Sequence, residues 1–161
     1  GVAGSLDDRL DVGDLVVSTD CVWHDFDVTP LGYRPGEIPG VGTINFPADE
    51  GLREATLAAA AQVAPDIHAY AGRVVSGDQF IASAGQKNRI TEGFGGMCCE
   101  MEGTAIAQAA WLNEVPFVVV RAISDKPGSA DQVVDYNTFE EKAARDCAAI
   151  VAHMVANPLR A

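Results

Sequence analysis

The stretch Val115-Pro-Phe-Val-Val-Val-Arg-Ala-Ile-Ser-Asp125 decides the fold class of this chain. It begins with an apolar, largely β-branched run, which is typical of a strand buried on both faces. It ends with three polar side chains, those of Arg121, Ser124 and Asp125. Because ligands of α/β proteins bind beyond the carboxyl ends of the strands, we expect these side chains to meet a ligand there.

Strands and helices alternate on the amino-terminal side of this stretch. The pattern predicts strands over 14–28, 69–75 and 97–101, and helices over 48–64 and 103–113. The last of these helices is almost wholly apolar or small, which predicts burial on most sides. The capping boxes Ser83/Gln86 and Thr138/Glu141 predict a short helix and the final helix. Residues 1–161 are therefore expected to form one α/β domain, a three-layer sandwich whose central mixed sheet is flanked by helices.

Two segments depart from this alternation. Residues 1–4 (GVAG) read as a glycine-rich turn of the kind that follows a strand, so we expect the amino-terminal strands of the domain to be missing from this sequence. Residues 29–47 are rich in proline and glycine and predict a long ordered loop, which is more often functional than idle. Its apolar side chains Leu31, Tyr33, Ile38 and Phe46 are expected to offer apolar surface.

The composition excludes several kinds of partner. The net charge of -12 repels phosphate backbones, which argues against nucleic acid and anionic membranes as partners. No apolar stretch approaches the roughly 20 residues that span a bilayer, and we expect a cytoplasmic protein. The four cysteines lack disulfide or ligand spacing and predict reduced core thiols, and the three histidines are isolated in sequence, so no metal site is expected.

Three carboxylates fall near the ends of predicted strands: those of Glu100, Glu102 and Asp125. If the strand continues through both glutamates, their side chains point the same way. Glu102 and Asp125 could each instead cap a helix or pair with Arg121, and position alone does not distinguish these interpretations. Two carboxylates in different surroundings at one sheet edge would let one hold a proton while the other stays ionised.

Phe80 and Ile81 follow a Ser-Gly-Asp turn just past another predicted strand. A single phenylalanine is more often a core residue than a binding surface. At a strand end, however, the ring is poorly placed for the core. It is therefore a candidate stacking surface for a flat heterocycle.

Several motifs together resemble those of a known family. Residues 76–81 (SGDQFI), 100–105 (EMEGTA) and 115–125 are similar, in order and spacing, to the 5′-methylthioadenosine/S-adenosylhomocysteine nucleosidases of the purine nucleoside phosphorylase-like superfamily. Residues 1–4, 12–18 (VGDLVVS) and 24–29 (HDFDVT) also match, so the resemblance covers essentially the whole chain.

The resemblance implies hydrolysis of the bond between adenine and a 5′-thio-substituted ribose, in methionine salvage, with no cofactor or metal. By similarity Asp125 donates a proton to adenine N7, Ser124 positions it, and Arg121 lies beside the attacking water. An aspartic acid is normally ionised at neutral pH, so this role requires surroundings that favour its protonated form. The substrate-binding residues implied are Phe80 and Ile81 at the base, Met101 and Glu102 at the ribose, and Ala3, Gly4 and Cys99.

The resemblance also implies a homodimer. Leu31, Tyr33 and Pro39 would reach into the neighbouring subunit's pocket and, with Tyr136 of that subunit's own late loop, form the site for the 5′-alkylthio group. The family's glutamate that activates water would precede Gly1.

Three alternatives stay open. A nucleoside phosphorylase of the same superfamily would use phosphate in place of water. Nucleosidases acting on 6-amino-6-deoxyfutalosine or AMP share the base-binding residues and differ at the 5′ end of the substrate. An inactive purine-binding α/β module would keep the pocket without turnover.

Overall fold

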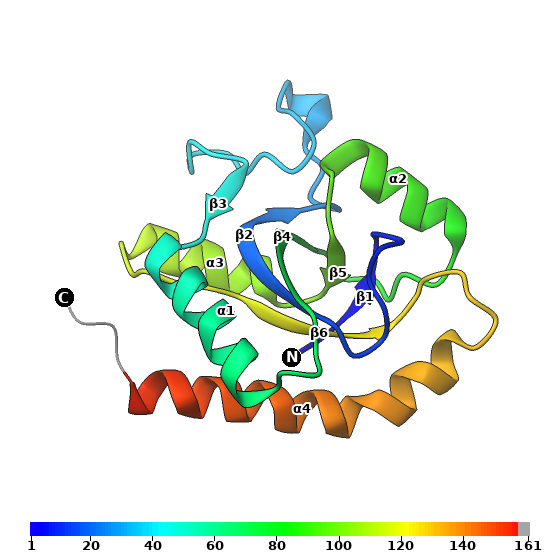
Figure 1. The fold of residues 1–161 in the computed structure, drawn as a ribbon. Coiled ribbons are helices and arrows are strands. Elements are labelled where there is room, and N and C mark those ends of the chain that lie inside the picture. Colours follow the sequence, from blue (N-terminus) through cyan, green and yellow to red (C-terminus); the bar gives the residue numbers. More distant parts are fainter. Residues whose placement is uncertain (158–161) are drawn as a thin grey trace.

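The computed structural model describes residues 1–157, apart from the side chains at positions 134 and 140, and is built around a six-stranded mixed sheet (Figure 1). The strands lie in the order β3-β2-β4-β5-β1-β6. Their bounds are β1 Val2–Ser5, β2 Leu15–Trp23, β3 Asn45–Pro47, β4 Ala69–Ser76, β5 Cys98–Glu100 and β6 Val120–Asp125. The helices are α1 Glu50–Val63, α2 Ala84–Phe94, α3 Gly103–Leu112 and α4 Gln132–Ala156, with a short 3-10 turn over Thr29–Leu31.

The sheet curls until its ends meet. β6 pairs in parallel with β1 and also antiparallel with β2, through Leu15–Ala122, Val16–Arg121 and Val17–Val120. Five strands therefore form a closed ring, and β3 extends it as an antiparallel partner of β2. The parallel pairs β2–β4 and β4–β5 bring their carboxyl ends to one edge.

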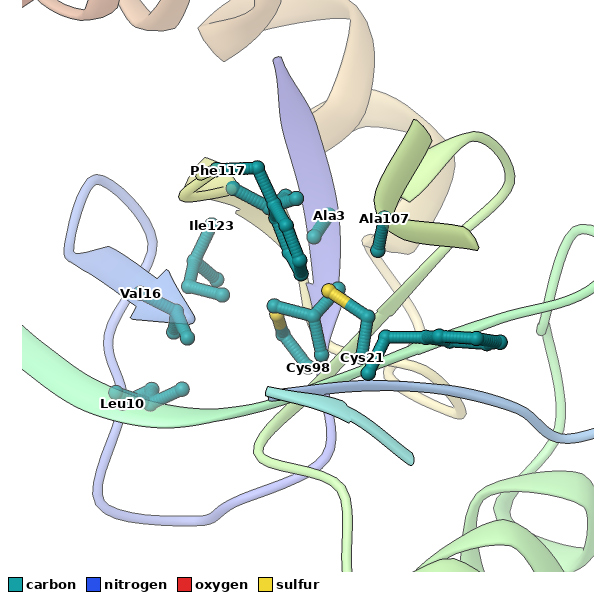
Figure 2. Packing of buried hydrophobic residues seen from close by; sticks show 11 residues of the cluster. Ala3, Leu10, Val16, Cys21, Cys98, Ala107, Phe117 and Ile123 are labelled. Carbon is teal, nitrogen blue, oxygen red and sulfur yellow. The ribbon is translucent and has the colours of Figure 1, made fainter. Parts of the chain in front are cut away.

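The helices cover the sheet on different sides. The long α4 runs beneath β6 and beside α1, and α3 packs against β2, β3 and β4 (Figure 1). The interior is filled from several strands at once: Ala3, Val16, Cys98 and Ile123 come from β1, β2, β5 and β6 and converge (Figure 2). The predicted α/β class, with a mixed sheet flanked by helices, is confirmed.

Most predicted elements are confirmed in place. Asp49 caps α1 by accepting a hydrogen bond from the backbone N–H of Leu52, and Ser83 and Gln86 form the predicted capping box of α2. The interpretation of residues 1–4 as a turn is wrong, because Val2–Ser5 forms the central strand β1.

The stretch Val115–Asp125 is a strand only in its second half. β6 begins at Val120, and Val115 is 55% exposed. The predicted strand over 14–28 ends at Trp23. The final helix starts at Gln132 instead of near Thr138, so the second predicted capping box is wrong.

Two burial predictions are also wrong. α3 is not buried on most sides, because Ile106, Trp111 and Leu112 are exposed on it. Phe46 offers no surface, since β3 places its ring in the core. Apolar composition thus overestimated the burial of α3, and the loop interpretation missed the burial of Phe46.

The four cysteines are free and buried, as expected for core thiols. Burial raises the pKa of the Cys21 and Cys99 thiols to about 12, so neither is a thiolate nucleophile near neutral pH. Within residues 1–157, no helix is long and apolar enough to cross a membrane. In the same range His, Cys, Asp and Glu side chains form no cluster able to hold a metal ion.

Candidate active site

A pocket of about 110 Å³ opens where β1, β5 and β6 lie side by side. Its walls are formed by strand residues, by the loop after β4, by the start of α3 and by one residue of α4. The lining residues are Val2, Ala3, Gly4, Gln79, Phe80, Ile81, Cys99, Glu100, Met101, Glu102, Ser124, Asp125 and Tyr136.

Asp125 is the buried acid of this pocket, with 2% of its surface exposed. The Ser124 hydroxyl lies 2.7 Å from Oδ1 and donates to it, and the Gln132 amide donates to Oδ2 across 2.8 Å. Among the described residues, neither Arg121 nor a backbone N–H at the start of a helix contacts this carboxyl group. The capping and ion-pair interpretations therefore do not apply to Asp125.

Gly4 allows β1 to approach this acid closely. A Cβ atom at position 4 would lie 3.3 Å from Asp125 Oδ2 and 3.0 Å from Pro127 Cγ. Any side chain here would have to push one of these groups away. The glycine of the GVAG segment thus has a steric role in the pocket wall.

Glu100 is the carboxylate that pairs with arginine and caps a helix. Its Oε2 contacts Arg121 Nη2 and accepts the backbone N–H of Gly103 at 2.7 Å, at the start of α3. Its Oε1 accepts a hydrogen bond from the Ser76 hydroxyl. Because these partners fix both oxygens of a buried side chain, Glu100 is a rigid part of the pocket floor.

Glu102 is placed differently, because β5 ends at Glu100 and Glu102 is the cap residue of α3. Its side chain is 64% exposed, and its Oε2 lies 3.4 Å from Arg121 Nη2. The two glutamates therefore converge on one guanidinium although they are not on the same strand. Glu102 stays free enough to bind a ligand, whereas Glu100 is fully engaged.

Phe80 is not a core residue, since 47% of it is exposed. Its ring meets Tyr136 edge to face, with ring centroids 5.9 Å apart and an interplanar angle of 89°. Edge-to-face packing holds the ring while leaving an aromatic face available. Ile81 follows directly and lines the same pocket.

The pocket gathers most of the predicted site residues. Ten line it: Ala3, Gly4, Phe80, Ile81, Cys99, Met101, Glu102, Ser124, Asp125 and Tyr136. Arg121 lies behind the lining, in contact with Glu100 and Glu102. Leu31, Tyr33 and Pro39 do not line it, and their loop projects from the sheet (Figure 1).

Sequence reasoning missed Gln132 and the engagement of Glu100. Gln132 is 4% exposed and contacts the acid, but the region before it read as loop. Glu100 did carry a sequence signal for a place in the site, because it lies near the end of a predicted strand, two residues before Glu102. What the sequence did not show was that Ser76 lies close enough to bind it.

Comparison with known proteins accounts for this arrangement. Residues 1–156 match the phosphorylase superfamily as a whole. The chain belongs to the phosphorylase superfamily. Within it, the chain belongs to the 5′-methylthioadenosine/S-adenosylhomocysteine nucleosidases. It is 39% identical to such a nucleosidase from Treponema pallidum, over 90% of this chain and 62% of that protein.

Solved structures of phosphorylase superfamily members agree. The 5′-methylthioadenosine/S-adenosylhomocysteine nucleosidase of Colwellia psychrerythraea, in complex with adenine, superposes with a TM-score of 0.87 at 32% identity, covering 97% of this chain and 64% of that one. The futalosine hydrolase of Helicobacter pylori gives a TM-score of 0.88 at 31% identity, covering 98% and 66%. The chain thus spans 62% to 66% of the length of these relatives.

Proposed function

We propose that the protein hydrolyses the N-glycosidic bond of 5′-methylthioadenosine and S-adenosylhomocysteine, releasing adenine and the 5′-thioribose. The observation that carries this proposal is the buried Asp125 carboxyl group, held by Ser124 in a pocket that also presents the Phe80 ring. A flat base can lie against Phe80 while its edge meets the acid. The adenine complex of the Colwellia relative supports the choice of base.

Asp125 assists departure of the base. As the bond between C1′ and N9 breaks, its electron pair moves onto the purine, and a proton delivered to N7 by Asp125 neutralises the developing charge. The oxygen of water bonds to C1′ and releases a proton to solvent, and Asp125 takes up a proton from solvent before the next turnover. Ser124 holds one oxygen of the acid and so restricts its rotation.

The opposite side of the pocket receives the ribose. The exposed carboxylate of Glu102 can accept hydrogen bonds from two hydroxyls, and Met101, 42% exposed, supplies an apolar surface beneath the sugar. An oxocarbenium-like ribose is electron-poor, so negative charge from Glu102 stabilises the transition state. Arg121 limits that charge and fixes its position.

Three further residues shape the walls of the pocket. Ala3 and Gly4 of β1 are small enough to leave space for the substrate. The Cys99 thiol is 3.6 Å from the Gly4 carbonyl oxygen and remains protonated, because burial raises its pKa. We assign it a contact role and no covalent chemistry.

The proposed reaction is tested by product release. We expect adenine to appear from 5′-methylthioadenosine at a rate that does not depend on inorganic phosphate, with 5-methylthioribose as the second product. Chromatographic detection of both products would establish this. Formation of a ribose 1-phosphate, or release only when phosphate is present, would contradict hydrolysis and indicate a phosphorylase.

A second candidate substrate is 6-amino-6-deoxyfutalosine, favoured by the likeness to the Helicobacter futalosine hydrolase. The same assay decides between them through the ratio of kcat/KM values for the two nucleosides. In either case the reaction is a cytoplasmic one. With methylthioadenosine as the substrate it belongs to methionine salvage.

We also propose a homodimer in which Leu31, Tyr33 and Pro39 complete the neighbouring pocket at the 5′-alkylthio group. Leu31 is 73% exposed and Tyr33 37%, so this loop has apolar surface without an intramolecular role. Light scattering should give about twice the 16.9 kDa of one chain. Leu31→Glu should raise KM for 5′-methylthioadenosine by roughly tenfold, as expected for one lost apolar contact.

Leu112→Glu is the matched control for this variant, because Leu112 is similarly exposed but lies on α3, outside the loop and the pocket lining. A monomeric mass, or equal effects of the two substitutions, would count against the proposed contribution of the loop.

A further inference from the structure

Gln132 makes three hydrogen bonds around the acid. Its Nε2 donates to Asp125 Oδ2 at 2.8 Å and to the Ile81 carbonyl oxygen at 2.7 Å. Its Oε1 accepts the backbone N–H of Gly128 at 3.2 Å. The side chain is nearly buried, so water competes little for these bonds.

The partners determine which way the amide faces. The Ile81 carbonyl oxygen can only accept a hydrogen bond, and the Gly128 N–H can only donate one. A flipped amide would place its oxygen against the Ile81 oxygen and its NH2 group against the Gly128 N–H. Nε2 therefore faces Asp125 and Ile81.

Gln132 is not among the described residues that line the pocket, but Ile81 and Asp125, which accept its hydrogen bonds, are. Gln132 therefore lies behind the pocket wall. It is also the first residue of α4, so the helix start fixes its backbone. One planar group thus links the acid to the backbone next to Phe80. Ile81 lies in the loop between β4 and α2, whereas Asp125 is the last residue of β6.

We propose that Gln132 is a positioning residue for the Asp125 acid. This role rests on the proposed nucleosidase function. Ser124 binds one carboxyl oxygen and Gln132 the other, so together they fix the rotation of the carboxyl plane. Through Ile81, the same amide sets how far the acid lies from the edge of the base. Gln132 thereby aligns Asp125 with N7 of the purine.

The test compares binding of adenine with that of 7-deazaadenine, which carries C–H in place of N7 and cannot accept a hydrogen bond. Calorimetry on the whole chain gives two dissociation constants, and their ratio isolates the contact at position 7. We expect the unaltered protein to prefer adenine by about tenfold, the effect of one hydrogen bond. In Gln132→Met, which keeps the side-chain volume, the preference should fall below about threefold.

Gln132→Glu is the second variant. Its carboxylate still accepts from Gly128 but, when ionised, no longer donates to Asp125 or Ile81, so the same loss of preference is expected. The exposed Gln62 of α1 provides the control, and Gln62→Met should keep the full preference. A purely structural role would weaken binding of both purines equally and leave their ratio unchanged.

Two outcomes would overturn parts of this inference, and they can be told apart. An unchanged ratio in both Gln132 variants, with purine binding retained, would refute the positioning role alone. If the unaltered protein bound neither purine, the proposed function would fail, and the role of Gln132 with it.

Discussion

Asp125→Asn is expected to lower kcat for adenine release by about 10²-fold or more, the usual effect of losing a general acid. Asparagine has nearly the same shape as aspartate. Its oxygen can accept from the Gln132 amide and its NH2 group can donate to the Ser124 hydroxyl oxygen, so the pocket should keep its form. It cannot donate a proton to N7. Steady-state kinetics with 5′-methylthioadenosine should therefore show a large fall in kcat with a much smaller change in KM.

Asp66→Asn serves as the control, because Asp66 is exposed and lies outside the pocket. It makes the same substitution at the surface and should leave kcat unaltered. Near-normal turnover by Asp125→Asn would remove Asp125 from the role of acid. The pocket would then have to assist the leaving group by other means.

Arg121→Met should destabilise the protein by about 3–5 kcal/mol, the cost of leaving a buried charge without its partner. Arg121 and Glu100 are each 8% exposed, and the guanidinium is the only cationic side chain that contacts Glu100 among the ion pairs of the described residues. Urea denaturation should reveal the loss as a lower midpoint at an unchanged slope.

Two further variants define what this result means. Arg9→Met breaks the exposed pair with Asp7, and a surface pair contributes only about 0–1 kcal/mol. Adding Glu100→Gln to Arg121→Met should restore part of the lost stability, since it removes the orphaned charge. If Arg121→Met cost no more than Arg9→Met, the pair would not be an important support of the pocket floor.

The parts of the fold that could be predicted are those encoded by local pattern. α1 and α2 carry their own capping signals in Asp49 and Ser83, and β4 ends in Val74-Val75 directly before a Ser-Gly-Asp turn. The failures required knowledge of distant partners. Residues 1–4 have too little side chain to show a strand pattern, and only β5 and β6 make them one.

The site divides in the same way. Asp125, Ser124 and Phe80 were found because they follow predicted strands, and motifs added the residues of β1. Gln132 could not be found, because its role depends on a helix that begins six residues before the predicted cap at Thr138. Pairing with Arg121 was considered for Glu102 and Asp125, whereas its buried partner is Glu100.

Strand β1 pairs with β5 and β6, which lie far from it in the sequence. Contacts such as Cys99 to Gly4 and Ser124 to Ala3 join residues separated by 95 and 121 positions. Contacts that close such long loops slow folding. During synthesis, β1 leaves the ribosome before β5 and β6, and its contact with Ser124 can form only after 121 further residues have been added. The pocket is therefore completed only once β6 has been made.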